Sequence, residues 1–377
     1  MRILAALVLL AATLSAQTTR YRDPIFATTT TTSNIAYGAA INRFTNQLET
    51  LRLDVHEPAG DGDAGRAAFV MVHGGGFVGG DKADAQIVSL CRQLAQRGYF
   101  TVSINYRLMP QNQPITAQTI TDAKDDAKAA VRYLRANLAS YRLDTNRIAI
   151  GGSSAGGFTA LAVGYITGEG SSGNPGYPSN VRAIVDLWGA LLDVNVIETG
   201  EAPVCIVHGT NDPTVPYVNA TNIHARAQQV GVYSELHPLQ GAGHAPWNLT
   251  STFLPEIVTF LWEQMSLVQL AGLAARPGYA SPGTLTFDHF GSAGDLVVLC
   301  VAGSRVDTPL GSWGTFCLGL PFVALPAITL PATPRVATLP SALSVPAGLV
   351  GRSLWWQDAD FGGVVPRSFT NCVKTTF

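Results

Sequence analysis

The stretch Gly151-Gly152-Ser153-Ser154-Ala155-Gly156-Gly157 follows a short apolar run at residues 147–150 and precedes a helical pattern at residues 158–165. Its central part matches G-x-S-x-G, with Ser154 in the middle. A serine on a tight turn from strand to helix has its hydroxyl exposed above the end of a sheet, and small flanking residues let neighbouring elements approach closely. The same pattern is also typical of an ordinary Gly/Ser-rich turn. The role of Ser154 therefore depends on the surrounding chain.

Apolar runs of strand length alternate with helical periodicity on both sides of this stretch. Strands are predicted at residues 50–55, 67–72, 99–106, 147–150, 181–187, 204–207 and 234–239, and helices at 84–96, 121–138, 158–165, 219–230 and 253–269. This alternation predicts an α/β fold with a mostly parallel sheet and helices on both faces. Ligands bind such sheets at the carboxyl ends of the strands. Residues just after each strand are therefore the candidates for chemistry.

Three of the other predicted strands are followed by residues that suit nucleophilic catalysis. The segment His73-Gly74-Gly75-Gly76-Phe77 follows the second strand, and its glycines allow backbone N–H groups to point into a cavity as an oxyanion hole requires. A phosphate-binding loop is the alternative interpretation of these glycines, but no Lys-Ser or Lys-Thr follows at the spacing that such a loop needs. Asp212 and His244 follow the next two relevant strands. Together with Ser154 they predict a nucleophile, a base and an orienting carboxylate.

Residues 35–265 resemble the α/β-hydrolase superfamily, specifically bacterial esterases of the hormone-sensitive-lipase and feruloyl/acetyl-esterase-like branches. The resemblance is carried by His73-Gly74-Gly75-Gly76-Phe77, Asn105-Tyr106-Arg107-Leu108, Gly152-Ser153-Ser154-Ala155-Gly156-Gly157, His208-Gly209-Thr210-Asn211-Asp212 and Gly243-His244. It implies that Ser154 is the nucleophile, His244 the general acid/base and Asp212 its carboxylate. It also implies an oxyanion hole formed by the backbone N–H groups of Gly75, Gly76 and Ala155.

Other polar and aromatic residues have more open roles. Asp193 follows the strand at 181–187 and is the alternative triad acid. Phe77, Trp188 and Trp247 are candidate substrate-binding residues, although packing roles for the two tryptophans are equally reasonable. The remaining groups are predicted to be structural. His73 braces the glycine loop, and Arg107 pairs with Asp125 or Asp126. The other histidines are expected to be hydrogen-bonded or on the surface: His56, His208, His224 and His237.

Four segments are expected along the chain. Residues 1–16 have the charged start, apolar run and small-residue end of a signal peptide, and residues 17–34 look like a loosely packed leader. Residues 35–268 form the predicted catalytic domain. Residues 271–377 are rich in Pro and Gly and poor in charge, which predicts a small all-β, sandwich-like domain. An exported protein permits a disulfide among Cys300, Cys317 and Cys372.

Composition narrows the class of protein. A formal net charge of −2 with 13% charged residues gives no basic footprint for nucleic acid. No later segment is long and apolar enough for a membrane span, and no motif predicts a metal or other cofactor. We expect a secreted or periplasmic serine carboxylesterase acting on short-chain or carbohydrate-linked (acetyl or feruloyl) esters, of undefined oligomeric state. The alternatives are a serine peptidase of prolyl-oligopeptidase type and a catalytically silent binding protein.

Overall fold

The chain divides into two compact units, one formed by Arg20–Leu270 and one that includes Ala271–Phe377, and each is described by itself. The computed structural model describes residues 20–265 and 267, and in the second unit only the strands named below. The predicted signal peptide lies outside the described residues. Within them, no helix has the length and apolar character that a membrane span requires.

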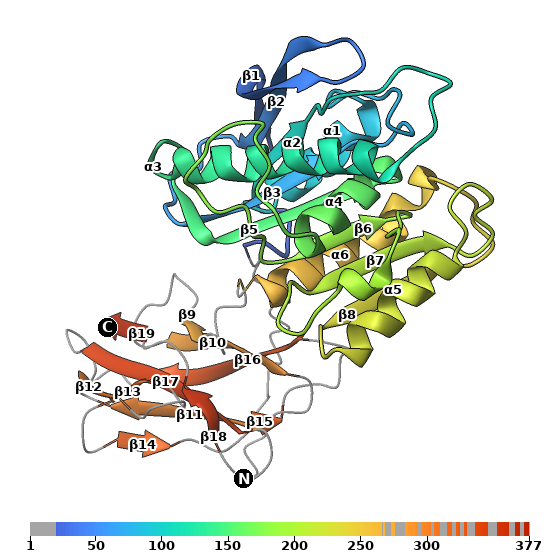
Figure 1. Cartoon of the computed structure of the whole chain (residues 1–377). Coiled ribbons are helices and arrows are strands. Elements are labelled where there is room, and N and C mark those ends of the chain that lie inside the picture. Colours follow the sequence, from blue (N-terminus) through green and yellow to red (C-terminus); the bar gives the residue numbers. More distant parts are fainter. Residues whose placement is uncertain are drawn as a thin grey trace, which may run out of the picture. The chain divides into compact units, whose positions relative to one another are not determined.

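The first unit is built on one eight-stranded sheet (Figure 1). Its strand order is β1-β2-β4-β3-β5-β6-β7-β8. The six strands β4, β3, β5, β6, β7 and β8 run parallel to one another, and β2 pairs antiparallel with both of its neighbours, β1 and β4. All residues of β3, β4 and β7 are buried. Their continuous apolar runs indicate this, because such runs are typical of a sheet that is covered on both faces. The strands are β1 (Thr29–Asn42), β2 (Gln47–Pro58), β3 (Arg66–Val72), β4 (Phe100–Ile104), β5 (Leu143–Ser153), β6 (Ile184–Leu187), β7 (Val204–Gly209) and β8 (Ser234–Leu239).

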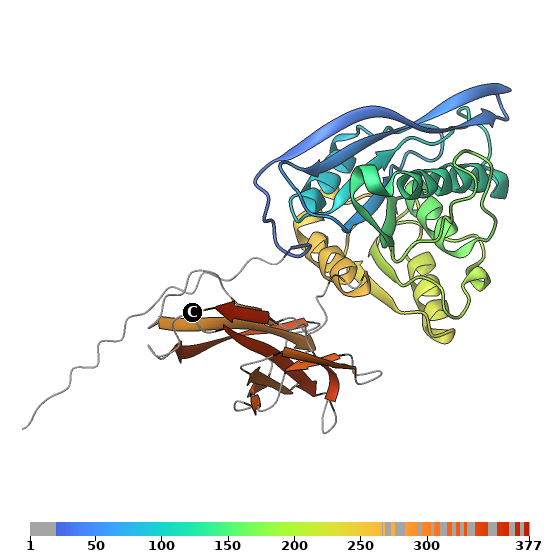
Figure 2. The ribbon, with the colours of Figure 1, turned by 90° about the vertical axis from the view of Figure 1, so that its left-hand side faces the viewer.

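Helices cover both faces of this sheet, with α2, α4 and α5 on one side and α1 and α6 on the other (Figure 2). The α/β-hydrolase fold predicted from the sequence is confirmed. Several element boundaries differ from the predicted ones by a few residues. For example, α2 begins before residue 121 because the Thr116 side chain accepts a hydrogen bond from the Thr119 N–H, and the Thr119 side chain accepts one from the Thr116 N–H. The helices are α1 (Ala85–Ala95), α2 (Ala117–Ala136), α3 (Leu138–Tyr141), α4 (Ala155–Tyr165), α5 (Val218–Gln229) and α6 (Thr250–Gln264), with short 3₁₀ turns η1 (Val194–Val196) and η2 (Trp247–Leu249).

The segment predicted to be a loosely packed leader is instead part of the first unit from Arg20 onward, so that prediction is wrong for its described residues. The Arg20 guanidinium is 2.7 Å from the Asp61 carboxylate, and Tyr21 is buried. From Thr29 the chain forms β1, an edge strand with much of its polar surface exposed. Two register shifts interrupt the pairing of β1 with β2, and such bulges break the polar/apolar alternation that would reveal a strand.

The described residues of the second unit all lie in antiparallel strands, which agrees with the all-β prediction; the sandwich arrangement stays a prediction. Cys300 is buried, with its Sγ 3.7 Å from the Val298 carbonyl oxygen, whereas the side chains of Cys317 and Cys372 lie outside the described residues. The sheets are β16-β10-β9, β14-β11-β17-β18 with β15 on β11 and β19 on β17, and β12-β13. The strands are β9 (Leu273–Ala275), β10 (Gly283–Ser292), β11 (Leu296–Ala302), β12 (Arg305–Pro309), β13 (Thr315–Leu318), β14 (Phe322–Ala324), β15 (Ile328–Thr329), β16 (Val336–Val345), β17 (Ser353–Phe361), β18 (Pro366–Phe369) and β19 (Val373–Thr376).

Candidate active site

Ser154 lies on the turn between β5 and α4, with φ 55° and ψ −119°. A positive φ is uncommon for a residue with a side chain, and it turns the hydroxyl away from the sheet. Two glycines make the turn sterically feasible. A Cβ on Gly152 would lie 2.1 Å from the Gly156 carbonyl oxygen, and one on Gly156 would lie 2.2 Å from the Val72 carbonyl oxygen. The partly exposed hydroxyl therefore projects from the carboxyl end of β5.

The structure brings Ser154, His244 and Asp212 together. The Nε2 atom of His244 is 2.9 Å from the Ser154 Oγ, and its Nδ1 atom is 2.7 Å from the Asp212 Oδ2. His244 comes from the loop after β8 and Asp212 from the loop after β7, so the three side chains meet at the carboxyl edge of the parallel strands. Both distances are those of ordinary or charge-assisted hydrogen bonds.

Asp212 is held as a carboxylate although its side chain has no exposed surface. Burial disfavours the charge, but hydrogen bonds from His244 and from the backbone N–H groups of Val215 and Thr214 outweigh it and lower the pKa below its ordinary value. The two backbone donors both reach Oδ1, at 2.9 and 2.8 Å, which leaves Oδ2 to accept from the imidazole. The carboxylate therefore orients His244 with Nδ1 protonated and Nε2 free to accept a proton.

The structure separates the alternative acid from the histidine. Asp193 is exposed, and its carboxylate accepts a hydrogen bond from the Asn195 N–H at the start of η1.

His208 lies beside Asp212 and is buried, and burial lowers its pKa, so the ring is neutral. Its Nε2 is 2.8 Å from the Val215 carbonyl oxygen and 3.4 Å from the Asp212 Oδ2. His208 thus supports the loop that carries Asp212.

The glycine loop after β3 borders the same site. Gly75 and Gly76 have φ values of 106° and 61°, and the Gly75 carbonyl oxygen accepts hydrogen bonds from Val78 and Gly79. A Cβ on Gly75 would lie 2.1 Å from the Gly79 carbonyl oxygen, so this turn requires glycine. Ala155 is the first residue of α4, where backbone N–H groups have no partner within the helix. These three residues are those predicted to form the oxyanion hole, and that role stays a prediction.

His73 braces this loop, as the sequence predicted. Its Nδ1 donates to the Gly74 carbonyl oxygen at 2.7 Å, and its ring stacks on Tyr106 with centroids 4.5 Å apart. Burial lowers the pKa of His73, so the ring stays neutral. The Arg107 guanidinium pairs with Asp126 at 2.8 Å, which resolves the predicted choice between Asp125 and Asp126.

A cleft of about 380 Å³ opens beside the Ser154 hydroxyl. Trp188 and Trp247 both border it and meet edge to face, with ring centroids 5.0 Å apart, although the Trp188 side chain itself is fully buried. Phe77 does not: it is buried in the core against Tyr106 and Phe158. The prediction that Phe77 is a substrate-binding residue is therefore corrected: its ring packs in the core and does not line the cleft. The lining consists of Gly74, Gly75, Gly76, Gly80, Asp84, Gln86, Ile87, Ser153, Ser154, Trp188, Thr214, His244, Ala245 and Trp247.

Sequence reasoning missed part of this lining. Thr214 and Ala245 lie within two residues of Asp212 and His244, so strand-end reasoning could have found them. Gln86 and Ile87 come from the first turn of α1, and no local signal shows that this helix reaches the nucleophile. A larger cavity of about 710 Å³ lies at the opposite, amino ends of the strands. The first residues of β5 and residues preceding β6 and β7 line it, and none of the three catalytic candidates does.

Comparisons with known proteins agree with this geometry. Residues 53–195 match the family model BD-FAE. The chain is 26% identical over 255 residues to the probable carboxylic ester hydrolase LipM of Mycobacterium tuberculosis, covering 56% of this chain and 57% of that protein. It is 36% identical over 120 residues to ethyl acetate hydrolase of Pseudomonas putida, covering 31% of this chain and 35% of that protein. The chain thus spans little more than half the length of the first and about a third of the second.

Solved structures show the same fold. The esterase Est2 of Thermogutta terrifontis superposes with a TM-score of 0.52 at 24% identity, covering 61% of this chain and 91% of that chain. The same esterase phosphorylated by paraoxon gives a TM-score of 0.53 at 25% identity, covering 62% of this chain and 94% of that chain. The resemblance to bacterial esterases of hormone-sensitive-lipase type, and the α/β-hydrolase fold that it implied, are confirmed.

Proposed function

We propose that this chain is a serine carboxylic ester hydrolase in which Ser154 is the nucleophile, His244 the general acid/base and Asp212 the orienting carboxylate. The single observation that carries the proposal is the continuous hydrogen-bonded path from the Ser154 Oγ through His244 to Asp212, with distances of 2.9 and 2.7 Å. A strained serine, an imidazole and a buried carboxylate in this order have no packing role that requires all three. They suit acyl transfer.

The mechanism follows from the positions of these groups. His244 accepts the hydroxyl proton at Nε2 while the Ser154 Oγ attacks the ester carbonyl carbon, and Asp212 stabilises the imidazolium that forms. Backbone N–H groups of Gly75, Gly76 and Ala155 are suited to meet the negative oxygen of the tetrahedral intermediate, each lowering the barrier by about 3 kcal/mol. His244 then protonates the leaving alcohol. Water, activated by the same imidazole, releases the acid from the acyl-enzyme.

The dimensions of the cleft favour small acyl groups. Its volume of about 380 Å³ lies at the low end of the range for ligand pockets, and it is open to solvent. Within the described residues, the connection from α4 to β6 contains neither helix nor strand, and none of its residues lines the cleft. We therefore infer short-chain esters as substrates, including acetyl groups on carbohydrate. The bulkier feruloyl esters expected from the sequence are a second proposal. The similarity to ethyl acetate hydrolase supports the short acyl group.

The deciding experiment compares wild type, Ser154→Ala and Ser153→Ala on p-nitrophenyl acetate, butyrate and octanoate. Wild type should be most active on acetate or butyrate, Ser154→Ala should lose at least about 10³-fold in kcat, and Ser153→Ala should keep most of the rate because the contact with His244 is intact. An inactive wild type, or a loss at Ser153 in place of Ser154, would disprove the assignment. Acetylated xylan and methyl ferulate then separate the two carbohydrate-linked classes.

The remaining expectations are separate proposals with their own tests. Hydrolysis of a peptide anilide at a rate similar to that of an ester would favour the peptidase alternative. Ester turnover that depends on Ser154 would exclude a catalytically silent binding protein. Export is proposed from the composition of residues 1–16. It is tested by fractionating cells that express the full chain and by determining the N-terminal residue of the product.

A further inference from the structure

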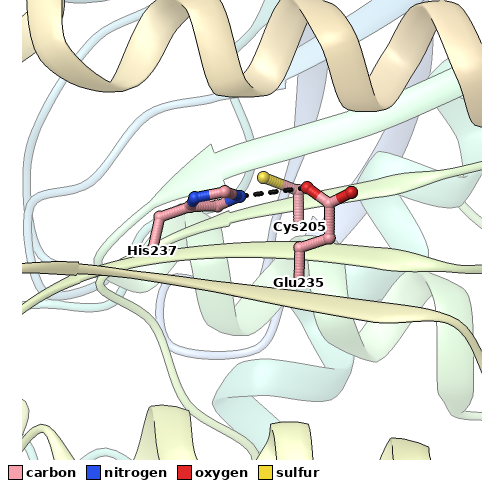
Figure 3. Close-up of side chains that lie close together, drawn as sticks. All are labelled: Cys205, Glu235 and His237. Atoms are coloured by element: carbon pink, nitrogen blue, oxygen red, sulfur yellow. Dashed lines mark hydrogen bonds and ion pairs between the residues drawn. The ribbon is translucent and has the colours of Figure 1, made fainter. Parts of the chain in front are cut away.

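Three side chains of metal-binding type meet on one face of β7 and β8, away from the cleft (Figure 3). They are Cys205, Glu235 and His237, and one ligand atom from each lies within 4.8 Å of the other two. The imidazole and the carboxylate are in direct contact, with the His237 Nε2 3.0 Å from the Glu235 Oε2. The catalytic mechanism uses none of these groups.

Strand register explains why they meet. The parallel pairing of β7 with β8 sets Cys205 opposite Glu235 and Val207 opposite His237. Residues two apart on a strand share a face, so Glu235 and His237 lie beside each other on the same face as the thiol. The 29 residues between Cys205 and Glu235 include α5, and they contain no compact metal-binding motif. The donor set exists only in the folded sheet.

The chemistry of the donors suits zinc. A thiolate, an imidazole nitrogen and a carboxylate oxygen are the three ligand types that Zn²⁺ takes in proteins, at about 2.3, 2.0 and 2.0 Å. Around a tetrahedral ion, ligand atoms at these lengths are about 3.3 to 3.6 Å apart. Small side-chain rotations would bring separations of 3.0 to 4.8 Å into this range. One thiolate and one carboxylate would also neutralise the two charges of the ion.

A hydrogen bond orients one of the donors, and a carboxylate lies near a second. The Tyr233 hydroxyl donates to the Glu235 Oε1 at 2.7 Å, and the Glu256 Oε2 lies 3.8 Å from the His237 Nδ1. In metal sites the ligating carboxylate is commonly hydrogen-bonded, and the second ring nitrogen of a ligating histidine donates to a carboxylate or carbonyl. Cys205 is fully buried, whereas the His237 side chain keeps 17% of its surface exposed. An ion could therefore enter from that side and keep a water as its fourth ligand.

We propose that Cys205, Glu235 and His237 bind one Zn²⁺ ion that ties β7 to β8, with Glu256 orienting His237. Binding replaces the hydrogen bond between His237 and Glu235. The thiol releases its proton, and the imidazole coordinates through Nε2 with its proton on Nδ1, facing Glu256. The competing interpretation is a hydrogen-bonded His–Glu pair beside a buried thiol that binds no metal.

The test uses the full chain prepared without a polyhistidine tag, loaded with Zn²⁺ and dialysed against metal-free buffer. Wild type should retain one zinc per chain, and Co²⁺ substitution should give a thiolate-to-cobalt charge-transfer band. Saturating Zn²⁺ should raise Tm by about 5 °C or more relative to EDTA. Cys205→Ala and His237→Gln should each weaken binding at least about 100-fold, and Cys205→Ala should abolish the cobalt band.

Matched controls keep the proposal falsifiable. Cys91→Ala removes another fully buried thiol, and His224→Gln removes a histidine that contacts Ser234 at the start of β8. Both should bind zinc as wild type does. If His237→Gln fails to fold cooperatively, Glu235→Gln supplies the same test with the smallest change in shape. A wild type that retains no zinc, or zinc binding unaffected by Cys205→Ala and by the folded histidine or glutamate variant, would overturn the proposal.

Discussion

Replacing Asp212 by Asn should inactivate the enzyme through the tautomer of His244 with little effect on the fold. Backbone N–H groups of Thr214 and Val215 both donate to Oδ1, at 2.8 and 2.9 Å, so the amide oxygen of the variant must stay at that position. The amide NH₂ then faces the His244 Nδ1, which has to accept a hydrogen bond. The proton moves to Nε2, the atom that must take the proton of Ser154.

The magnitude follows from losing the base while keeping the rest of the site. Wrong-tautomer variants of serine-hydrolase triads lose about 10⁴ in kcat, which is about 5.5 kcal/mol of barrier. Because Asn has the shape of Asp, we expect Asp212→Asn to lose 10³- to 10⁴-fold in kcat on p-nitrophenyl acetate, with a small change in KM and in Tm. The matched control is Asp193→Asn. Because the Asp193 carboxylate is exposed, this variant should have a kcat within about twofold of the wild-type value. A loss below tenfold at Asp212, or an equal loss at Asp193, would refute the reasoning.

Three further outcomes are expected. Burial raises the pKa of Asp186 to about 7, so the folded protein holds a proton that the unfolded chain has released by pH 5, and stability should fall as pH rises from about 4 through 7. Asp186→Asn should remove that loss, which is worth roughly 3 kcal/mol between pH 5 and 8 and is measured by urea unfolding of both proteins at those two pH values; parallel pH dependence in both would contradict it. Gly156→Ala places a Cβ 2.2 Å from the Val72 carbonyl oxygen and should lower kcat/KM at least about 100-fold. Gly62 has open space around it, so Gly62→Ala should leave kcat/KM unchanged, and equal kcat/KM values for the two variants would show that the turn is not constrained. Paraoxon should add one diethylphosphoryl group per chain, seen by mass spectrometry, and Ser154→Ala should remain unlabelled.

Much of the first unit was predictable because its signals are local and repeated. Buried parallel strands have continuous apolar runs, and the residues after them converge at one edge of the sheet. That reasoning predicts from the sequence alone that Ser154, Asp212 and His244 lie near one another. The same reasoning could not find β1, because two bulges interrupt its alternation and its threonines are largely exposed.

Side-chain direction was less predictable than position. Phe77 lies in the expected loop, yet its ring packs in the core against Tyr106 and Phe158. The approach of α1 to the cleft depends on how the helix packs on β3 and β4, which periodicity does not encode. The cluster of Cys205, Glu235 and His237 depends on the register of two parallel strands, and that register cannot be read from either strand alone.

The two loops that carry Asp212 and His244 are held together by more than the pairing of β7 with β8. The Asn211 N–H donates to the Ala242 carbonyl oxygen at 2.9 Å, and the Gly241 N–H donates to the Thr210 hydroxyl at 2.8 Å. A Cβ on Gly209 would lie 2.4 Å from the Ala242 carbonyl oxygen, so glycine at the end of β7 is what allows this approach. Because a shift of one residue in register turns every side chain to the opposite face, the same alignment of β7 and β8 sets the contact between Asp212 and His244 at one end and the proposed metal ligands further along the strands. Evidence for zinc at Cys205 would therefore also be evidence that this register holds in solution.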